Sequence, residues 1–207
     1  EIFAEASTTI LEEVERMRRI VEEFSRFARM PKPRAELMDL REVIEAVVSL
    51  YGGGTVVVTT RYDPQAGLVR ADREQITQVV HNLLQNACDA AQSAEAGGRV
   101  SVTLDPGDWG AAVVRIVDDG PGIPVEIRDR VFDPYFTTKS GGTGLGLAIV
   151  HRIVTDHGGR ISFECPSSGG TRFTVMLPRE GPPAEASTGD GAVSPAGSGK
   201  SAASWGY

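Results

Sequence analysis

Residues 81–90 of this 207-residue chain have the sequence HNLLQNACDA, in which apolar and polar side chains recur at helical spacing. The apolar stripe predicts a helix that packs against a core. Its residues are Ile76, Val79, Val80, Leu83, Leu84, Ala87 and Ala91. Asn82, Asn86 and Asp89 are spaced i, i+4 and i+7 and line up beside that stripe. An asparagine oxygen is a hard neutral ligand that suits Mg²⁺, an ion that also binds substrate phosphates. The alternative is an ordinary polar flank that faces water.

Helices and strands alternate on both sides of this stretch. Asp72, with Gln75 three residues later, predicts a capping box that opens the helix, which we expect to run to about residue 93. Further helices are predicted at about 40–50, after Asp39 as the cap, and at 144–157, and strands at 55–60, 99–104, 111–117, 160–164 and 171–177. This order predicts an α+β fold, a two-layer sandwich of a mixed, mostly antiparallel sheet with about three helices on one face.

A carboxylate and two glycines follow the strand predicted at 111–117, in the sequence VDDGPGI of residues 117–123. A buried carboxylate at a strand end needs a hydrogen-bond donor, and the amino group of adenine is one such donor. Gly120 and Gly122 let the chain turn close to a flat ligand. The alternative is a plain Asp-Gly turn.

A second glycine-rich segment, KSGGTGLGL at residues 139–147, leads into the helix predicted at 144–157. Backbone N–H groups at a helix N-terminus bind anions, and Lys139 adds a positive charge beside them. The glycine order is not that of a dinucleotide-binding fingerprint, and no strand leads straight into it. We therefore predict a phosphate-binding loop, with a flexible loop that binds no ligand as the alternative.

The two ends of the chain differ from its middle. Residues 2–28 lack Gly and Pro and carry a heptad-like apolar pattern, which is typical of a helix in a bundle, although a surface helix on its own domain is the alternative. Prolines at 31 and 33 end this helix and predict a linker. Residues 180–207 are rich in Gly, Pro, Ala and Ser, so we predict a disordered tail. Because the chain begins with Glu inside a helical pattern, we expect a piece of a longer protein.

The composition excludes several classes of function. A net charge of −7 argues against general attraction to nucleic acid or to an anionic membrane. No apolar stretch approaches the roughly 18 residues that a membrane span needs. Cys88 and Cys165 lie far apart in apolar segments, so we predict core residues of a reducing compartment rather than a zinc site or a disulfide.

In their order and spacing, these motifs resemble the catalytic, ATP-binding domain of two-component sensor histidine kinases, within the superfamily shared with gyrase B, Hsp90 and MutL ATPases. The resembling segments are the N box at 82–90, the first glycine box at 118–123, the F box at 132–139, the second glycine box at 142–147 and a closing strand at 170–173. The first 40 residues resemble the second dimerisation helix and linker of nitrogen-regulation kinases. The resemblance implies a dimerisation-type helix at 1–30, a linker at 31–38, a Bergerat-type ATP-binding domain at 39–179 and a tail at 180–207.

The resemblance also implies roles for single residues. Asp118 would accept the adenine amino group with Thr171 nearby, Asn86 would hold Mg²⁺, Asn82 would support the ion or the phosphates, and Lys139 would lie near the phosphates. Asn82, Asn86 and Lys139 are thus the expected catalytic residues. The other residues expected to shape the ATP pocket are Gly120, Gly122, Ile123, Gly142, Thr143, Gly144, Leu145, Gly146 and Leu147. Phe132 and Phe136 are expected to be packing residues.

Two departures from the family pattern affect the expected activity. ATPase relatives carry a glutamate where this chain has Asn82; an amide is a poor base, which favours transfer to a histidine over hydrolysis. The phosphoacceptor box is absent, because His81, His151 and His157 lack its neighbouring residues, and we expect all three to be structural. Asp89 stands where many relatives have a basic residue, so no phosphate role is expected for it.

The resemblance therefore implies a histidine kinase catalytic core that uses ATP and Mg²⁺ and phosphorylates a histidine absent from this fragment. The implied partners are ATP, a second copy through the dimerisation helices and a response-regulator receiver domain, with neither nucleic acid nor direct membrane contact. The implied location is the cytoplasm, with upstream segments as candidates for anchoring the intact protein to the inner membrane. Two alternatives stay open: a nucleotide-binding dimerisation and signalling module without turnover, and a gyrase-type ATPase.

Overall fold

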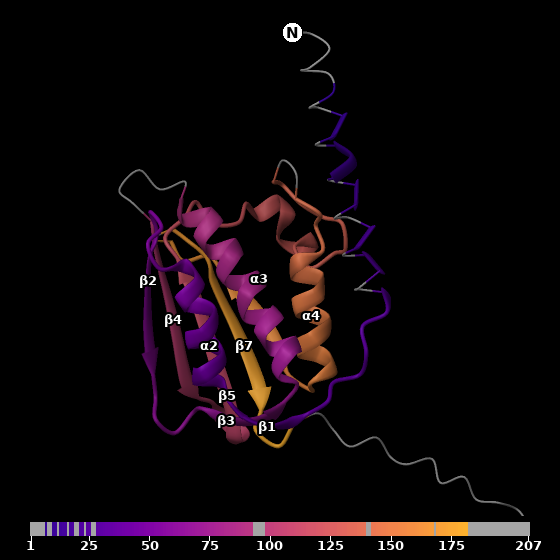
Figure 1. The fold of residues 1–207 in the computed structure, drawn as a ribbon. Helices are drawn as coiled ribbons and strands as arrows, with labels where there is room; N and C mark the ends of the chain where they lie inside the picture. The colour runs from indigo at the N-terminus through magenta and orange to yellow at the C-terminus, as the bar shows by residue number, and fades with distance from the viewer. Residues whose placement is uncertain are drawn as a thin grey trace, which may run out of the picture.

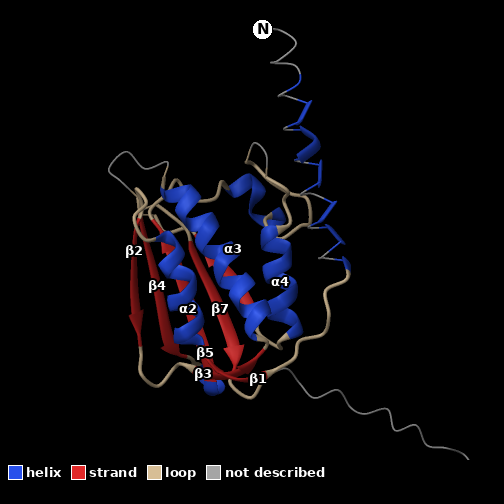
Figure 2. Cartoon of the chain, viewed as in Figure 1, coloured by secondary structure: helices blue, strands red, loops and turns tan. Residues whose placement is uncertain are grey.

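The computed structural model describes residues 28–92, 98–139, 142–167 and 169–181, together with separate positions between 7 and 25. Three helices lie on one face of a five-stranded sheet, which gives a two-layer α+β sandwich (Figures 1 and 2). The helices are α2 (Leu40–Val48), α3 (Arg73–Ala91) and α4 (Gly146–Asp156). The strands are β2 (Val57–Tyr62), β4 (Arg99–Pro106), β5 (Ala111–Asp118), β6 (Arg160–Glu164) and β7 (Arg172–Pro178). The predicted fold class is confirmed.

The sheet has the strand order β2-β4-β5-β7-β6, in which β2 and β4 are parallel and the other three pairings are antiparallel. Alternate side chains of the central strands are buried under the helices, as expected for a sheet with one solvated face. The buried positions of β5 and β7 include Ala112, Val114, Ile116, Phe173, Val175 and Leu177. Asp118 comes two residues after Ile116 and therefore lies on the same, helix-covered face at the end of β5.

A small second sheet was not predicted. β1 (Glu36–Asp39) pairs antiparallel with β3 (Leu68–Ala71), so residues 36–38 of the predicted linker form a strand. Each strand has four residues, and the partners are separated by the whole of α2 and β2, so the local pattern holds little signal. Three short 3₁₀ helices complete the described elements: η1 (Ser49–Tyr51), η2 (Asp108–Gly110) and η3 (Val125–Arg130).

Helix α3 begins with half of the predicted capping box. Asp72 Oδ1 accepts a hydrogen bond from the backbone N–H of Gln75 at 3.1 Å. The Gln75 amide does not return this bond; it donates to the carbonyl of Pro31, and the Asp72 N–H donates to Nε2 of His157 at 3.0 Å. Nδ1 of His157 lies 2.8 Å from the carbonyl oxygen of Ile153, which makes it the donor of a neutral ring. The buried His157 is therefore structural, as predicted.

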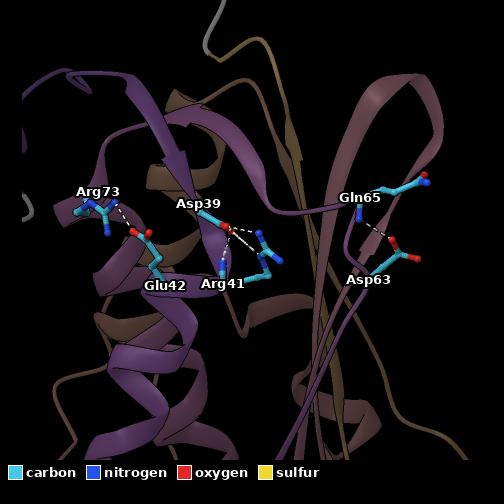
Figure 3. A network of polar contacts seen from close by, with 6 residues as sticks. All are labelled: Asp39, Arg41, Glu42, Asp63, Gln65 and Arg73. Carbon is cyan, nitrogen blue, oxygen red and sulfur yellow. Dashed lines mark hydrogen bonds and ion pairs between the residues drawn. The ribbon is translucent and has the colours of Figure 1, made fainter.

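Asp39 is the N-cap of helix α2, as predicted, and its side chain accepts hydrogen bonds from Arg41 (Figure 3). Asp39 Oδ1 accepts from the backbone N–H of Arg41 at 2.9 Å, and the Arg41 guanidinium donates to both carboxylate oxygens. Hydrogen bonds from this guanidinium lower the pKa of the Asp39 carboxyl below its ordinary value. An ion pair between Glu42 and Arg73, at 3.0 Å, joins α2 to the start of α3 in the same view.

The described residues between 7 and 28 are helical, and this segment projects past the end of the sandwich at which α4 begins (Figure 1). Its apolar positions Ile10, Val14, Met17 and Val21 are mostly exposed. Phe24 is closer to the sandwich, with its ring centroid 6.3 Å from that of Tyr135. The exposed stripe favours the bundle interpretation over a helix packed along its own domain. Of the predicted tail, residues 182–207 lie outside the described residues.

Candidate functional site

A cleft of about 1240 Å³ lies between α3, the start of α4 and the loop that follows η3. Asp118, the last residue of β5, and Phe173, near the start of β7, also line it. Twelve of the residues predicted for the site line this cleft: Asn82, Asn86, Asp118, Gly122, Ile123, Lys139, Gly142, Thr143, Gly144, Gly146, Leu147 and Thr171. Motifs that are far apart in the sequence therefore converge on one concave surface.

Two predicted residues lie beside the cleft rather than in its wall. Leu145 occupies the N-cap position of α4, and its side chain is fully buried in the core. Gly120 packs on α3, where an added Cβ would lie 2.7 Å from the carbonyl oxygen of Ala90. Gly120 thus brings the end of β5 against α3, which a larger residue would prevent. Neither residue presents a side chain to the cleft.

Asp118 has one fixed and one available oxygen. Oδ1 accepts hydrogen bonds from the backbone N–H groups of Gly120 at 3.0 Å and Thr171 at 3.2 Å. Oδ2 has no hydrogen-bond partner among the described residues. The side chain is only 5% exposed, and burial raises the pKa of its carboxyl, although the two N–H groups act in the opposite direction. A buried carboxylate with an available oxygen suits a ligand that donates a hydrogen bond.

Close backbone contacts position Thr171 against Asp118. The Asp118 N–H donates to the Thr171 carbonyl at 3.0 Å, and the Gly170 N–H donates to the Gly120 carbonyl at 2.9 Å. Gly170 has φ of +80°, and a Cβ there would lie 2.0 Å from the Asp118 carbonyl oxygen. The sequence predicted a site role for Thr171 and placed Gly170 only in the closing strand; the paired glycines before β7 were the available signal for its close contact with Asp118.

The polar edge of α3 faces the cleft as predicted from its spacing. Asn86 Oδ1 accepts a hydrogen bond from Nζ of Lys139 at 2.8 Å, so this amide oxygen already faces a cation. Such an oxygen fits the donor type that Mg²⁺ takes. Asn82 Nδ2 donates to the Gly146 carbonyl at 3.2 Å and joins α3 to the start of α4. Asp89, for which no phosphate role was predicted, accepts a hydrogen bond from Nζ of Lys139 at 2.7 Å.

The start of α4 has the properties of an anion site. No side chain caps its first N–H groups, because Leu145 occupies the cap position. Gly144 has φ of +71°, and its carbonyl accepts from the N–H of Tyr135 at 2.9 Å. A Cβ on Gly144 would lie 2.4 Å from the Tyr135 carbonyl carbon, so the close approach requires glycine. Oxygen atoms of a phosphate are suitable partners for these N–H groups.

Part of the remaining wall is apolar, and such a surface suits a flat ring system. Sequence reasoning named Ile123 and Leu147 but missed the apolar lining residues Ile127, Val131, Ile149 and Phe173. Their shared face is formed by tertiary packing and had no local signal. Phe132 packs against His151 and Phe163, with centroid distances of 5.4 and 6.0 Å, as expected of a packing residue. Phe136 also lines the cleft, under the Arg130 guanidinium.

Fold and cleft together define a nucleotide-binding α+β sandwich, and comparison with known families agrees. Residues 71–181 match the family described as "Histidine kinase-, DNA gyrase B-, and HSP90-like ATPase", and the chain belongs to that family. Within it, the chain is the ATP-binding catalytic domain of the type found in two-component sensor histidine kinases.

Similar proteins support this assignment. The chain is 39% identical to nitrogen regulation protein NtrY of Azorhizobium caulinodans over 89% of this chain and 25% of that protein. It is 32% identical to sensory histidine kinase/phosphatase NtrB of Rhodobacter capsulatus over 84% of this chain and 52% of that protein. The catalytic domain of histidine kinase ThkA superposes with a TM-score of 0.63 at 32% identity, covering 71% of this chain and 97% of the other.

The chain spans a quarter to a half of the length of these curated relatives. A solved complex of ThkA with the response regulator protein TrrA is also similar, with a TM-score of 0.68 at 28% identity over 83% of this chain and 49% of the other. Among the residues that the structure describes, no helix is long and apolar enough to cross a membrane.

Proposed function

We propose that this chain binds ATP with Mg²⁺ in the cleft and transfers the γ-phosphoryl group to a histidine of a two-component signalling protein. The observation that carries the proposal is the carboxylate of Asp118, of which one oxygen is held by two backbone N–H groups while the other has no partner in the described chain. The amino group of adenine is a donor of matching chemistry. Family membership supports ATP as the ligand.

The other residues of the cleft supply the phosphate chemistry. Mg²⁺, when bound, would neutralise part of the triphosphate charge, and the Asn86 oxygen would hold it. Lys139 and the N–H groups at the start of α4 would stabilise charge on the transferred group. Ile123 and Leu147 would border the adenine ring. The arrangement positions the nucleotide and leaves the acceptor to approach from outside the cleft.

The acceptor is a histidine other than the three in this chain. Both ring nitrogens of His157 are engaged, and the ring is 1% exposed. His81 and His151 are exposed, but neither is followed by the acidic residue of a phosphoacceptor box, because Asn82 and Arg152 come next. Asn82 is an amide at the place of a water-activating carboxylate, and its Nδ2 bonds to Gly146. Hydrolysis should therefore be slow in comparison with transfer.

The described part of the N-terminal helix supports a role in dimerisation. Its apolar positions Ile10, Val14, Met17 and Val21 are exposed, which leaves a stripe for a second helix to cover. We assign residues 1–30 to a dimerisation helix, 31–38 to a linker, 39–179 to the catalytic domain and 180–207 to a tail. The partners are a second copy and a response-regulator receiver domain, and the location is the cytoplasm. The response regulator in the ThkA complex supports this choice.

The test supplies a separate helix that carries a phosphoacceptor histidine, together with labelled ATP and Mg²⁺. Labelled phosphate should appear on the acceptor, and the Asn86→Ala variant should lose this transfer. A matched control is Gln78→Ala, a cleft residue of α3 about two turns earlier, which should keep it. Nucleotide that is bound but never transferred would replace the kinase with a signalling module without turnover. Steady phosphate release without an acceptor would favour a gyrase-type ATPase.

A further inference from the structure

We propose that Asp89 is a positioning residue that holds Lys139 on Asn86, so that the lysine competes with Mg²⁺ for the amide oxygen. The inference rests on the proposed function, because it concerns the same cleft before nucleotide binds. It assigns a role to a residue of α3 for which the sequence indicated none. Mg²⁺ that accompanies the nucleotide must then displace the Lys139 ammonium from the Asn86 oxygen.

Four contacts carry the argument. Nζ of Lys139 donates to Oδ2 of Asp89 at 2.7 Å and to Oδ1 of Asn86 at 2.8 Å. Oδ1 of Asp89 accepts from Nε2 of Gln85 at 2.6 Å. Gln85 in turn accepts from the hydroxyl of Tyr51 in η1 at 3.2 Å. Gln85 thus holds one oxygen of the carboxylate while Lys139 holds the other, and the ammonium is held by two acceptors about one helical turn apart.

Electrostatics makes this arrangement selective. The Asp89 side chain is one third exposed, and that of Lys139 less than half, so the pair is partly shielded from water. Two cations on one amide oxygen repel each other, so Asn86 cannot hold Mg²⁺ well while Lys139 stays on it. The adenine subsite at Asp118 does not involve this oxygen. The contact between Lys139 and Asn86 should therefore weaken the binding of ATP with Mg²⁺ and leave the binding of adenosine unchanged.

The first test measures Lys139 directly and needs no nucleotide. The chain has three lysines, Lys32, Lys139 and Lys200, so acylation of their amines is readily resolved by mass spectrometry. In Asp89→Asn, the acylation rate of Lys139 relative to Lys32 should rise about threefold or more, because the ammonium loses its charged acceptor. Glu45→Gln removes the same charge from an exposed residue of α2 outside the cleft and should leave the ratio unchanged. An unchanged ratio in Asp89→Asn would overturn the proposal.

The second test titrates a non-hydrolysable ATP analogue with Mg²⁺, and adenosine, by calorimetry. Asp89→Asn should bind the analogue about fivefold more tightly and should bind adenosine as the parent chain does. Glu45→Gln, outside the cleft, should change neither affinity more than twofold. In a Lys139→Ala background, Asp89→Asn should lose its effect, because it acts through the lysine. Weaker binding of the analogue by Asp89→Asn, or an equal gain for adenosine, would overturn the inference. A parent chain that binds neither compound would overturn the proposed function and this inference with it.

Discussion

Oδ1 of Asp118 accepts a hydrogen bond from the backbone N–H of Thr171, 3.2 Å away, across 53 residues of sequence. The antiparallel pairing of β5 with β7 brings the two residues together, since Val117 is opposite Arg172 in the register. The scaffold thus orients the carboxylate before any ligand arrives. Such preorganisation means that little ordering remains to be done when nucleotide binds.

Replacement of Asp118 by Asn tests the adenine contact at nearly constant shape. The amide oxygen can keep the bonds from Gly120 and Thr171, but the amide nitrogen then faces the donor of the ligand. We expect the binding free energy of a non-hydrolysable ATP analogue to weaken by about 2–3 kcal/mol. A charge-assisted hydrogen bond is lost, and the amide nitrogen and the adenine amino group, which are both donors, then face each other. Calorimetric titration measures the loss, and a melting temperature no lower than that of the parent chain shows that the fold is retained. Unchanged affinity would remove Asp118 from the site.

The same carboxylate predicts a pH dependence. Burial raises the pKa of Asp118 above its ordinary value, so its ionised form is lost at a higher pH than that of an exposed aspartate. Nucleotide affinity should fall as pH falls through this raised pKa. The free energy of unfolding changes with pH in the opposite direction, because the folded state binds the Asp118 proton more tightly than the unfolded state does. The stability that Asp118 contributes in this way is present below its unfolded pKa and is lost as pH rises through its folded pKa. Nucleotide affinity and the free energy of unfolding, each measured between about pH 4 and pH 8, check these two signs. The Asp118→Asn variant is the control that should lack both dependences.

Two neighbouring glycines of the phosphate loop should respond differently to alanine. Gly144 has φ of +71°, and its Cβ would lie 2.4 Å from the Tyr135 carbonyl carbon. Gly144→Ala should therefore cost about 2–3 kcal/mol in the free energy of unfolding. At Gly146, in the first turn of α4, an added Cβ would lie 4.0 Å from the Asn82 side chain, which is an ordinary contact, so alanine should cost nothing. Denaturant unfolding of both variants decides, and equal losses would contradict the structural explanation.

The cap of α2 provides a prediction away from the cleft. The Arg41 guanidinium lowers the pKa of Asp39, so Asp39 contributes stability above its unfolded pKa, and this contribution is lost as pH falls through the lowered, folded pKa. Asp39→Ala should lower the free energy of unfolding by about 1–1.5 kcal/mol at neutral pH, mostly through the lost cap. The difference should shrink in acid. Asp63→Ala removes a turn bond to the Gln65 N–H, seen in Figure 3, and should cost less.

The sequence predicted those elements whose signal is local. β6 was predicted at 160–164 and is Arg160–Glu164, and α3 follows its predicted cap and apolar stripe. β2 was predicted at 55–60 but is Val57–Tyr62, because its pairing with β4 begins at Val57 opposite Arg99. β1 and β3 were missed because each strand has only four residues, which is too short to show a clear alternation of apolar and polar side chains. They are also not joined by a turn that would indicate a hairpin.

The site shows the same division. Asp118 and the asparagines of α3 could be predicted, since strand alternation and helical spacing place their side chains. The bond between Lys139 and Asp89 could not, because the loop and the helix that provide them are 50 residues apart and only the packed fold sets their distance. The Gln75 amide is a further case, because its acceptor is the Pro31 carbonyl and not the expected local backbone group.

Asn86 gives the sharpest test of the metal. If its oxygen holds Mg²⁺ between α3 and the phosphates, the ion strengthens nucleotide binding through this residue, and Asn86→Ala should abolish that gain. The ratio of affinities for a non-hydrolysable ATP analogue with and without Mg²⁺ should fall to about one, while affinity for adenosine stays unchanged because Asp118 is untouched. Gln78→Ala, on the same helix and in the same cleft, should keep the parent ratio. A ratio preserved in Asn86→Ala would show that the ion is bound through other groups, and a loss of adenosine binding would show that Asn86 supports the pocket rather than the metal.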